Sequence, residues 1–161
     1  MSTLSTGSAV LTAIRNYGVD TVFGIPGTHN LEFYRSLKDL GMRVVTTRHE
    51  QGAGYGSDGW SLQTGLPGVV ITTSGPGLLN ALSAAATSFC ESRPMLILAP
   101  GPEQGAEFAD KGTLHETKDQ FSAAAAIVET AVRVTSAHEA VEAVHAAYER
   151  FATARPRPTY I

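Results

Sequence analysis

The sequence predicts an α/β fold, a three-layer sandwich with a mostly parallel sheet and helices on both faces. The first observation is that segments with helical spacing alternate with short apolar segments, as in βα units joined by right-handed crossovers. The second is that Val69–Thr73 and Met95–Ala99 are nearly continuous apolar runs, typical of strands buried on both faces of a parallel sheet. A chain of 161 residues is long enough for one such domain, and we expect residues 1–161 to form it.

The first half of the chain contains three expected strands, each preceded by a helix. Apolar residues at helical spacing indicate helices over 8–17 and 29–40, and Gly18 and Gly41 stand where such helices end. Strands are expected at 21–25, which the pair Pro26-Gly27 closes, and at 43–47. A helix over 50–64 then leads through a glycine-rich turn to the strand at 69–73.

The second half continues the alternation with one interruption. A tight glycine loop precedes an alanine-rich helix over 78–91, and the strand at 95–99 follows. Residues 100–119 form the longest irregular stretch, a length typical of functional or mobile loops. A short helix over 120–126, a strand over 131–134 and an amphipathic helix over 137–151 complete the pattern.

Composition excludes several classes of protein. Mixed charges and a net charge of −3 argue against a nucleic-acid partner or an anionic membrane surface. A single cysteine, Cys90, fits a reducing cytoplasm, and we expect it to be a small buried residue. No charged-then-apolar leader and no membrane-length apolar run occurs, so the expected location is cytoplasmic. The last residues begin what looks like a new strand, which suggests a fragment of a longer polypeptide or a split subunit.

Glu50 is the leading functional candidate. It stands where a strand ends and a helix begins, at the sheet edge where open α/β folds hold ligands. The small residues that follow it would allow another surface to approach closely. The alternative is a carboxylate that only stabilises the start of a helix through the helix dipole. Position alone leaves both interpretations open.

The loop Gly75-Pro76-Gly77 is a second candidate. It lies between a strand and a helix, as in a dinucleotide fingerprint, but Asn80 replaces the last glycine and Pro76 removes an N–H group. A tight turn that brings a helix against the sheet explains the glycines equally well, although it does not explain Asn80. The five histidines show no spacing for a metal site, so no metal-binding residue is expected in this chain.

Several motifs in order resemble the N-terminal pyrimidine-binding domain of thiamine-diphosphate enzymes, the group of acetolactate synthases, pyruvate oxidases and 2-oxo acid decarboxylases. The motifs are Val22–Gly27, Arg48–Gly54, Asp58–Trp60, Gly65–Val70 and Thr73–Ala81. The resemblance implies thiamine diphosphate as cofactor, with Glu50 bonded to nitrogen N1′ of the aminopyrimidine ring and favouring its imino form.

The resemblance also implies roles for the surrounding residues. The pyrimidine ring would be lined by Thr73, Pro76, Gly77 and Asn80. The thiazolium and the substrate would lie beside Pro26 and Gly27. His29 and His115 would tune the choice of substrate, and His115 replaces a glutamine that is usual in the synthases. The segments around these histidines look most similar to the guanidino-2-oxopentanoate decarboxylase branch.

The resemblance also implies partner domains, because this sequence lacks the family's motif for binding diphosphate. The family binds diphosphate and Mg²⁺ through a Gly-Asp-Gly motif in a separate domain, and this sequence contains no such motif. The resemblance therefore implies a homo-oligomer, a dimer or tetramer, in which the diphosphate-binding domain of another subunit completes the site. It also implies a middle domain, which in some relatives carries FAD. We expect this chain alone to be inactive.

The expected function is the cofactor-activating domain of a 2-oxo acid decarboxylase or carboligase, with a small 2-oxo acid as substrate. An acetolactate-synthase-type domain is an alternative within the family. A non-catalytic α/β module for binding or assembly is a second alternative. A nucleotide-dependent oxidoreductase domain is a third, and it would require the Gly75 loop to bind pyrophosphate.

Overall fold

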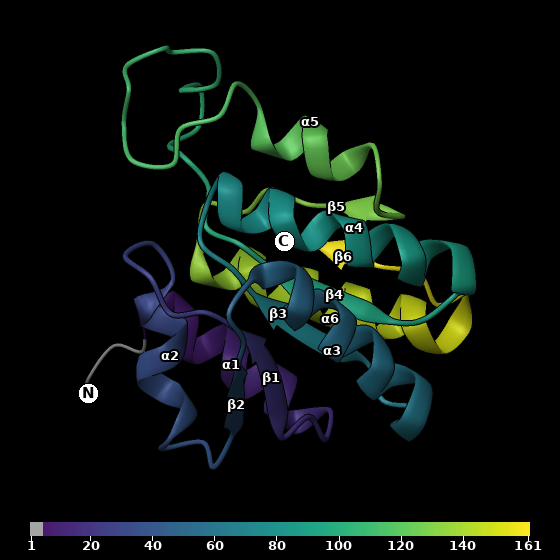
Figure 1. Cartoon of the computed structure of the whole chain (residues 1–161). Coiled ribbons are helices and arrows are strands. Elements are labelled where there is room, and N and C mark those ends of the chain that lie inside the picture. Colours follow the sequence, from purple (N-terminus) through teal and green to yellow (C-terminus); the bar gives the residue numbers. More distant parts are fainter. Residues whose placement is uncertain (1–4) are drawn as a thin grey trace.

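A single parallel sheet with the strand order β2-β1-β3-β4-β6-β5 organises the computed structural model, which describes residues 5–161 (Figure 1). The strands are β1 (Thr21–Gly24), β2 (Arg43–Thr46), β3 (Gly68–Ile71), β4 (Met95–Leu98), β5 (Thr130–Ala131) and β6 (Thr159–Tyr160). The helices are α1 (Thr6–Asn16), α2 (Leu31–Leu37), α3 (Glu50–Thr64), α4 (Pro76–Glu91), α5 (Gln120–Ala125) and α6 (Ala137–Thr153).

Successive residues of a strand point to opposite faces of the sheet. Because both faces carry apolar side chains, helices cover both of them. On one face, Ile71 and Leu96 pack in a cluster with residues of α1, α2 and α6. On the other face, Val70 and Ile97 pack with residues of α3, α4 and α5. The three-layer α/β sandwich expected from the sequence is confirmed.

The four longer strands are joined by crossovers on opposite faces. From β1 the chain passes through α2 to β2 at the sheet edge, and from β3 it passes through α4 to β4 on the other side. Strand order therefore reverses between β1 and β3, which pair at Phe23–Val70 and Gly24–Ile71. In open parallel sheets the crevice beyond the strand ends at such a reversal is the usual ligand site.

Several element boundaries differ from expectation by one to three residues, and two of these differences have a physical cause in the structure. The helix expected over 29–40 begins only at Leu31, because the buried side chain of Asn30 binds the preceding turn instead of continuing the helix. The strand expected over 131–134 is β5, which pairs with β6 over only two residues, Thr130–Thr159 and Ala131–Tyr160. The expectation that Cys90 is buried is wrong, since it lies on the exposed side of α4.

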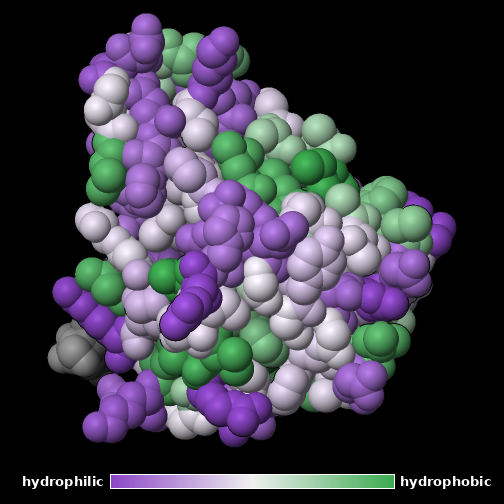
Figure 2. Space-filling view, in the orientation of Figure 1, coloured by the Kyte–Doolittle hydropathy of each residue, from purple (hydrophilic) through white to green (hydrophobic). Residues whose placement is uncertain are grey.

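The surface is uneven in polarity. Hydrophilic side chains dominate the 100–119 loop at the upper left of the molecule in Figure 2. The exposed large apolar side chains include Tyr55 and Leu62 on α3 and Leu79 on α4. No helix among residues 5–161 is long and apolar enough to cross a membrane.

Candidate active site

Three loops meet at the carboxyl edge of the sheet, where strand order reverses. The loop after β1 carries Pro26 to Asn30, the loop after β2 leads to Glu50, and the loop after β3 carries Thr73 to Gly77. Parallel strands end at the same edge, so residues that are far apart in sequence become neighbours there. Every cofactor-binding residue that the sequence indicated lies in these loops or in the first turns of the helices that follow.

Glu50 is the first residue of α3. The side chain of His49 caps this helix, with Nδ1 accepting a hydrogen bond from the N–H of Gln51 at 3.2 Å. The half-buried Glu50 accepts a hydrogen bond at Oε2 from Nδ2 of Asn80, at 3.0 Å. Glu50 therefore both begins a helix and pairs with a group on α4, and the pairing accounts for Asn80, which a simple tight turn did not explain.

Glycines keep this edge closely packed around Thr73. A Cβ atom at Gly27 would lie 2.5 Å from Cγ2 of Thr73, and one at Gly77 would lie 2.3 Å from Oγ1 of the same residue. The Gly77 position is also 3.6 Å from Oε1 of Glu50. Gly27, Thr73, Gly77, Glu50 and Asn80 thus form one continuous surface. Pro26 and Pro76, the latter at the start of α4, are exposed beside it.

Tyr34 of α2 is a neighbour of Glu50 that sequence reasoning missed. Its hydroxyl donates to the carbonyl of Ile71 at 3.3 Å, and a Cβ atom at Gly24 would approach the hydroxyl to 2.5 Å. Burial, and secondarily the negative charge of Glu50, raises the pKa of Tyr34 above its ordinary value of 10.0. A tyrosine in an amphipathic helix signals only a core position, so the sequence carried no hint of this contact.

Burial also raises the pKa values of Tyr148 and Tyr160, which predicts a loss of stability in alkali. Above pH 10 the unfolded chain releases phenolic protons that the native state retains, so the free energy of unfolding falls as pH rises. Below that pH these tyrosines contribute no pH dependence. Urea unfolding on both sides of pH 10 measures the fall, which is expected to be smaller in Tyr34→Phe. An equally steep fall in that variant would contradict the contribution of Tyr34.

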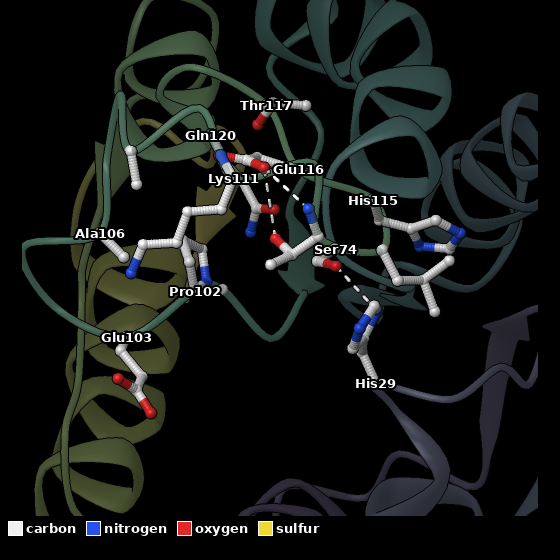
Figure 3. Close-up of a pocket in the computed structure, with 14 residues that line it drawn as sticks. His29, Ser74, Pro102, Glu103, Ala106, Lys111, His115, Glu116, Thr117 and Gln120 are labelled. Atoms are coloured by element: carbon white, nitrogen blue, oxygen red, sulfur yellow. Dashed lines mark hydrogen bonds between the residues drawn. The ribbon is translucent and has the colours of Figure 1, made fainter.

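A cavity of about 310 Å³ is lined by Ser74, the first residue of the Ser74–Gly77 turn, and by residues of the 100–119 loop. Figure 3 shows His29, Ser74 and His115 together along its wall. Nδ1 of His29 is 2.8 Å from Oγ of Ser74, and the rings of His29 and His115 meet edge to face with centroids 5.2 Å apart. The structure thus brings the two predicted histidines together, and it places Glu50 next to this cavity but not among the residues that line it.

Two buried amides that sequence reasoning missed hold these loops. Asn30 accepts from the N–H of Gly27 at 2.8 Å and donates to the carbonyl of Ile25 at 3.0 Å. Gln120 accepts from the N–H of Gly75 at 2.6 Å and donates to Tyr160 and the carbonyl of Pro100. An asparagine after a Pro-Gly turn is a recognisable turn signal. A glutamine at the start of a short helix offers none.

Residues 5–161 contain no cluster of three histidine, cysteine or acidic side chains that could hold a metal ion. His138 and His145 lie on the exposed face of α6, and His145 bonds to the hydroxyl of Tyr17 at 2.7 Å. Neither of them lines the cavity beside Ser74.

The sequence family described as "Thiamine pyrophosphate enzyme, N-terminal TPP binding domain" matches residues 4–123. The chain belongs to this family. The match contains all three loops of the candidate site. Membership in the thiamine pyrophosphate family confirms the resemblance drawn from the sequence motifs.

Curated relatives include decarboxylases and acetolactate synthases. The chain is 42% identical over 99% of its length to a probable 2-ketoarginine decarboxylase, AruI, of Pseudomonas aeruginosa, of which the match covers 28%. It is 31% identical over 95% of its length to a probable acetolactate synthase large subunit of Methanocaldococcus jannaschii, covering 25% of that protein. An acetolactate synthase large subunit, IlvG, of Mycobacterium tuberculosis is 36% identical over 60% of the chain. The matches span between 18% and 28% of the length of these relatives.

Proposed function

We propose that this chain is the pyrimidine-binding, cofactor-activating part of a thiamine-diphosphate-dependent 2-oxo acid decarboxylase. The observation that carries the proposal is the Glu50–Asn80 pair at the sheet edge, next to a cavity that contains His29 and His115. A carboxyl group at this position can share a proton with a weakly basic ring nitrogen. The loops that hold it come from strands on both sides of the topological reversal, where α/β folds bind ligands.

The residues present fit an aminopyrimidine ring. Glu50 would bind its N1′ nitrogen. The ring would be lined by Thr73, Pro76, Gly77 and Asn80, with Pro26 and Gly27 beside the thiazolium. A Cβ atom at Gly27 or Gly77 would collide with Thr73, so both glycines are required for the loops to close around this residue. When bound, thiamine diphosphate would supply the nucleophilic carbon and the electron sink that decarboxylation of a 2-oxo acid requires.

Different residues of this chain would activate the cofactor and contact the substrate. Glu50 would hold a proton at a carboxyl oxygen and share it with N1′, while Asn80 keeps the carboxyl group oriented. His29 and His115 would contact the substrate from the cavity wall. The fold also keeps the carboxyl group half-buried, which limits competition from water.

We propose that parts outside residues 1–161 complete the site. The diphosphate-binding domain of another subunit in a homo-oligomer would provide the groups for diphosphate and Mg²⁺, and the proposal is supported by the chain's coverage of only 28% of AruI. Residues 1–161 would then form one domain of a larger assembly and show no turnover alone. FAD, if the enzyme uses it, would lie in a middle domain.

The substrate we propose is a 2-oxo acid with a guanidino group. The support is the 42% identity to a protein named as a probable 2-ketoarginine decarboxylase. In the intact enzyme, kcat/KM for 2-ketoarginine is expected to exceed that for pyruvate at least about tenfold, with release of carbon dioxide and an aldehyde. The measurement is a coupled decarboxylase assay with product analysis. Equal values for the two acids would contradict the substrate assignment.

Acetolactate synthesis is the second candidate function, because relatives with that name match up to 95% of the chain. His115 disfavours it, since the synthase resemblance leads us to expect glutamine there. The same product analysis separates the two functions. Acetolactate formed from pyruvate as the main product would support the synthase and refute the decarboxylase.

A further inference from the structure

We propose that Ser74 is a positioning residue that fixes the proton of His29. Its hydroxyl would donate to Nδ1 of His29, so that the neutral imidazole carries its proton on Nε2 and offers it to the cavity. An oxygen of the 2-oxo acid would then be the acceptor. This inference rests on the proposed function, and it assigns a role to a residue that the sequence motifs did not single out.

The geometry of both loops supports a fixed Ser74–His29 contact. Oγ of Ser74 is 2.8 Å from Nδ1 of His29, and Ser74 is only 7% exposed. His29 is held in place by its neighbour Asn30, which is fully buried and bonds to two backbone groups of the preceding turn. The edge of the His115 ring packs against the His29 ring and limits its rotation.

The partners available to the Ser74 hydroxyl indicate which group donates in the Ser74–His29 hydrogen bond. Among residues 5–161, the Ser74 hydroxyl has one polar side-chain or backbone partner, which is Nδ1 of His29. If Ser74 donates to Nδ1, the hydroxyl proton and the ring nitrogen are both satisfied. If the ring donated instead, the proton of a nearly buried hydroxyl would have no acceptor among the protein groups of residues 5–161, at a cost in hydrogen bonding. The first arrangement leaves the ring proton on Nε2.

The position of the backbone at Ser74 is also fixed by its surroundings. The next residue, Gly75, has φ of 56° and donates its N–H to the buried Gln120. A Cβ atom at Gly75 would lie 2.0 Å from the carbonyl oxygen of His115, so the turn and the long loop are in direct contact. Ser74 therefore has little freedom to choose another partner. Its contact with His29 is part of the cavity wall and does not depend on a bound ligand.

The direct test is a nitrogen-15 NMR measurement on the intact protein labelled at histidine. Five of the labelled histidines lie in residues 1–161, and the signal of His29 is assigned by its loss in His29→Gln. The neutral wild-type ring is expected to carry its proton on Nε2, with Nδ1 as an acceptor. Ser74→Ala is expected to move the Nδ1 resonance, and Ser74→Thr, which keeps the hydroxyl, is expected to restore it. A wild-type ring protonated on Nδ1 would overturn the proposal.

Kinetics of the intact holoenzyme give a second test. Ser74→Ala is expected to lower kcat about tenfold, as loss of one oriented hydrogen bond would, and Ser74→Thr to recover most of it. In a His29→Ala background the Ser74→Ala change should have less than about a twofold effect, because Ser74 acts through His29. An undiminished effect in that background would refute the proposal. Ser83→Ala, on the exposed side of α4, is the matched control.

The outcomes separate this inference from the proposed function. If Glu50→Gln leaves the activity of the intact enzyme unchanged, the proposed function fails while the NMR result for His29 still decides the hydrogen-bond direction. If Glu50→Gln is inactive but Ser74→Ala alters neither the NMR signal nor kcat, only the role of Ser74 fails. Melting temperatures of all variants show whether any loss of activity reflects unfolding.

Discussion

Glu50→Gln is expected to lower kcat of the intact enzyme by roughly 10²–10⁴-fold, the range for loss of a positioned general acid–base group. Glutamine keeps the shape of the side chain and can still accept from Asn80, which lies 3.0 Å from Oε2 in the native protein. It cannot share a proton with a ring nitrogen. The measurement is the rate of decarboxylation with saturating 2-oxo acid, thiamine diphosphate and Mg²⁺.

A matched control tests whether the effect belongs to the site. Glu142 lies on the exposed side of α6, so Glu142→Gln is expected to leave kcat unchanged. Melting temperatures of the two variants should be close to that of the native protein. Near-native activity of a folded Glu50→Gln enzyme would refute the role of Glu50 and favour the interpretation of the chain as a non-catalytic binding or assembly module.

Asp58→Ala is expected to destabilise the chain by about 3 kcal/mol, near the lower end of the range for breaking a buried ion pair. Asp58 lies in α3 and its side chain is 8% exposed. It accepts a hydrogen bond from Ser88 of α4 at 2.6 Å and forms an ion pair with Arg93 at the end of that helix. Removal of the carboxylate leaves Arg93, whose side chain is 21% exposed, without its buried partner.

Urea unfolding followed by circular dichroism measures this loss. Glu91→Ala is the control, because Glu91 forms an exposed ion pair with the same arginine at 3.5 Å and should contribute less than about 1 kcal/mol. The double variant Asp58→Ala, Arg93→Met should be more stable than Asp58→Ala alone, since it leaves no uncompensated charge at the buried position. Similar losses for Asp58→Ala and Glu91→Ala would contradict the assignment of Asp58 as the buried link between α3 and α4.

Sequence periodicity was sufficient for most of the elements. The helix expected over 50–64 has those bounds in the structure, and the apolar runs near 69–73 and 95–99 are the buried strands β3 and β4. The errors had both local and tertiary causes. Asn30 bonds to a turn and delays α2, and β5 is short because it pairs with only two residues of β6. Cys90 is exposed because α4 buries its opposite face.

The site was only partly accessible from the sequence. Glu50, His29 and His115 were indicated by motifs, and their roles remain predictions. Tyr34, Ser74 and Gln120 were not identified, because each lies in the site through a contact with a residue at least 37 positions away in the chain. No local pattern of residues encodes such a contact.

By itself, the sequence determined the alternation of strands and helices, the family, and the candidate carboxylate at the start of α3, because these depend on local periodicity and on motifs of neighbouring residues. Only the tertiary structure decided which groups meet at the carboxyl edge of the sheet. It pairs Glu50 with Asn80 and His29 with Ser74, and the Ser74–Gly77 turn contacts both His115 and Thr73. The physical reason is that parallel strands bring the ends of distant segments to one edge, and close packing there selects the partners.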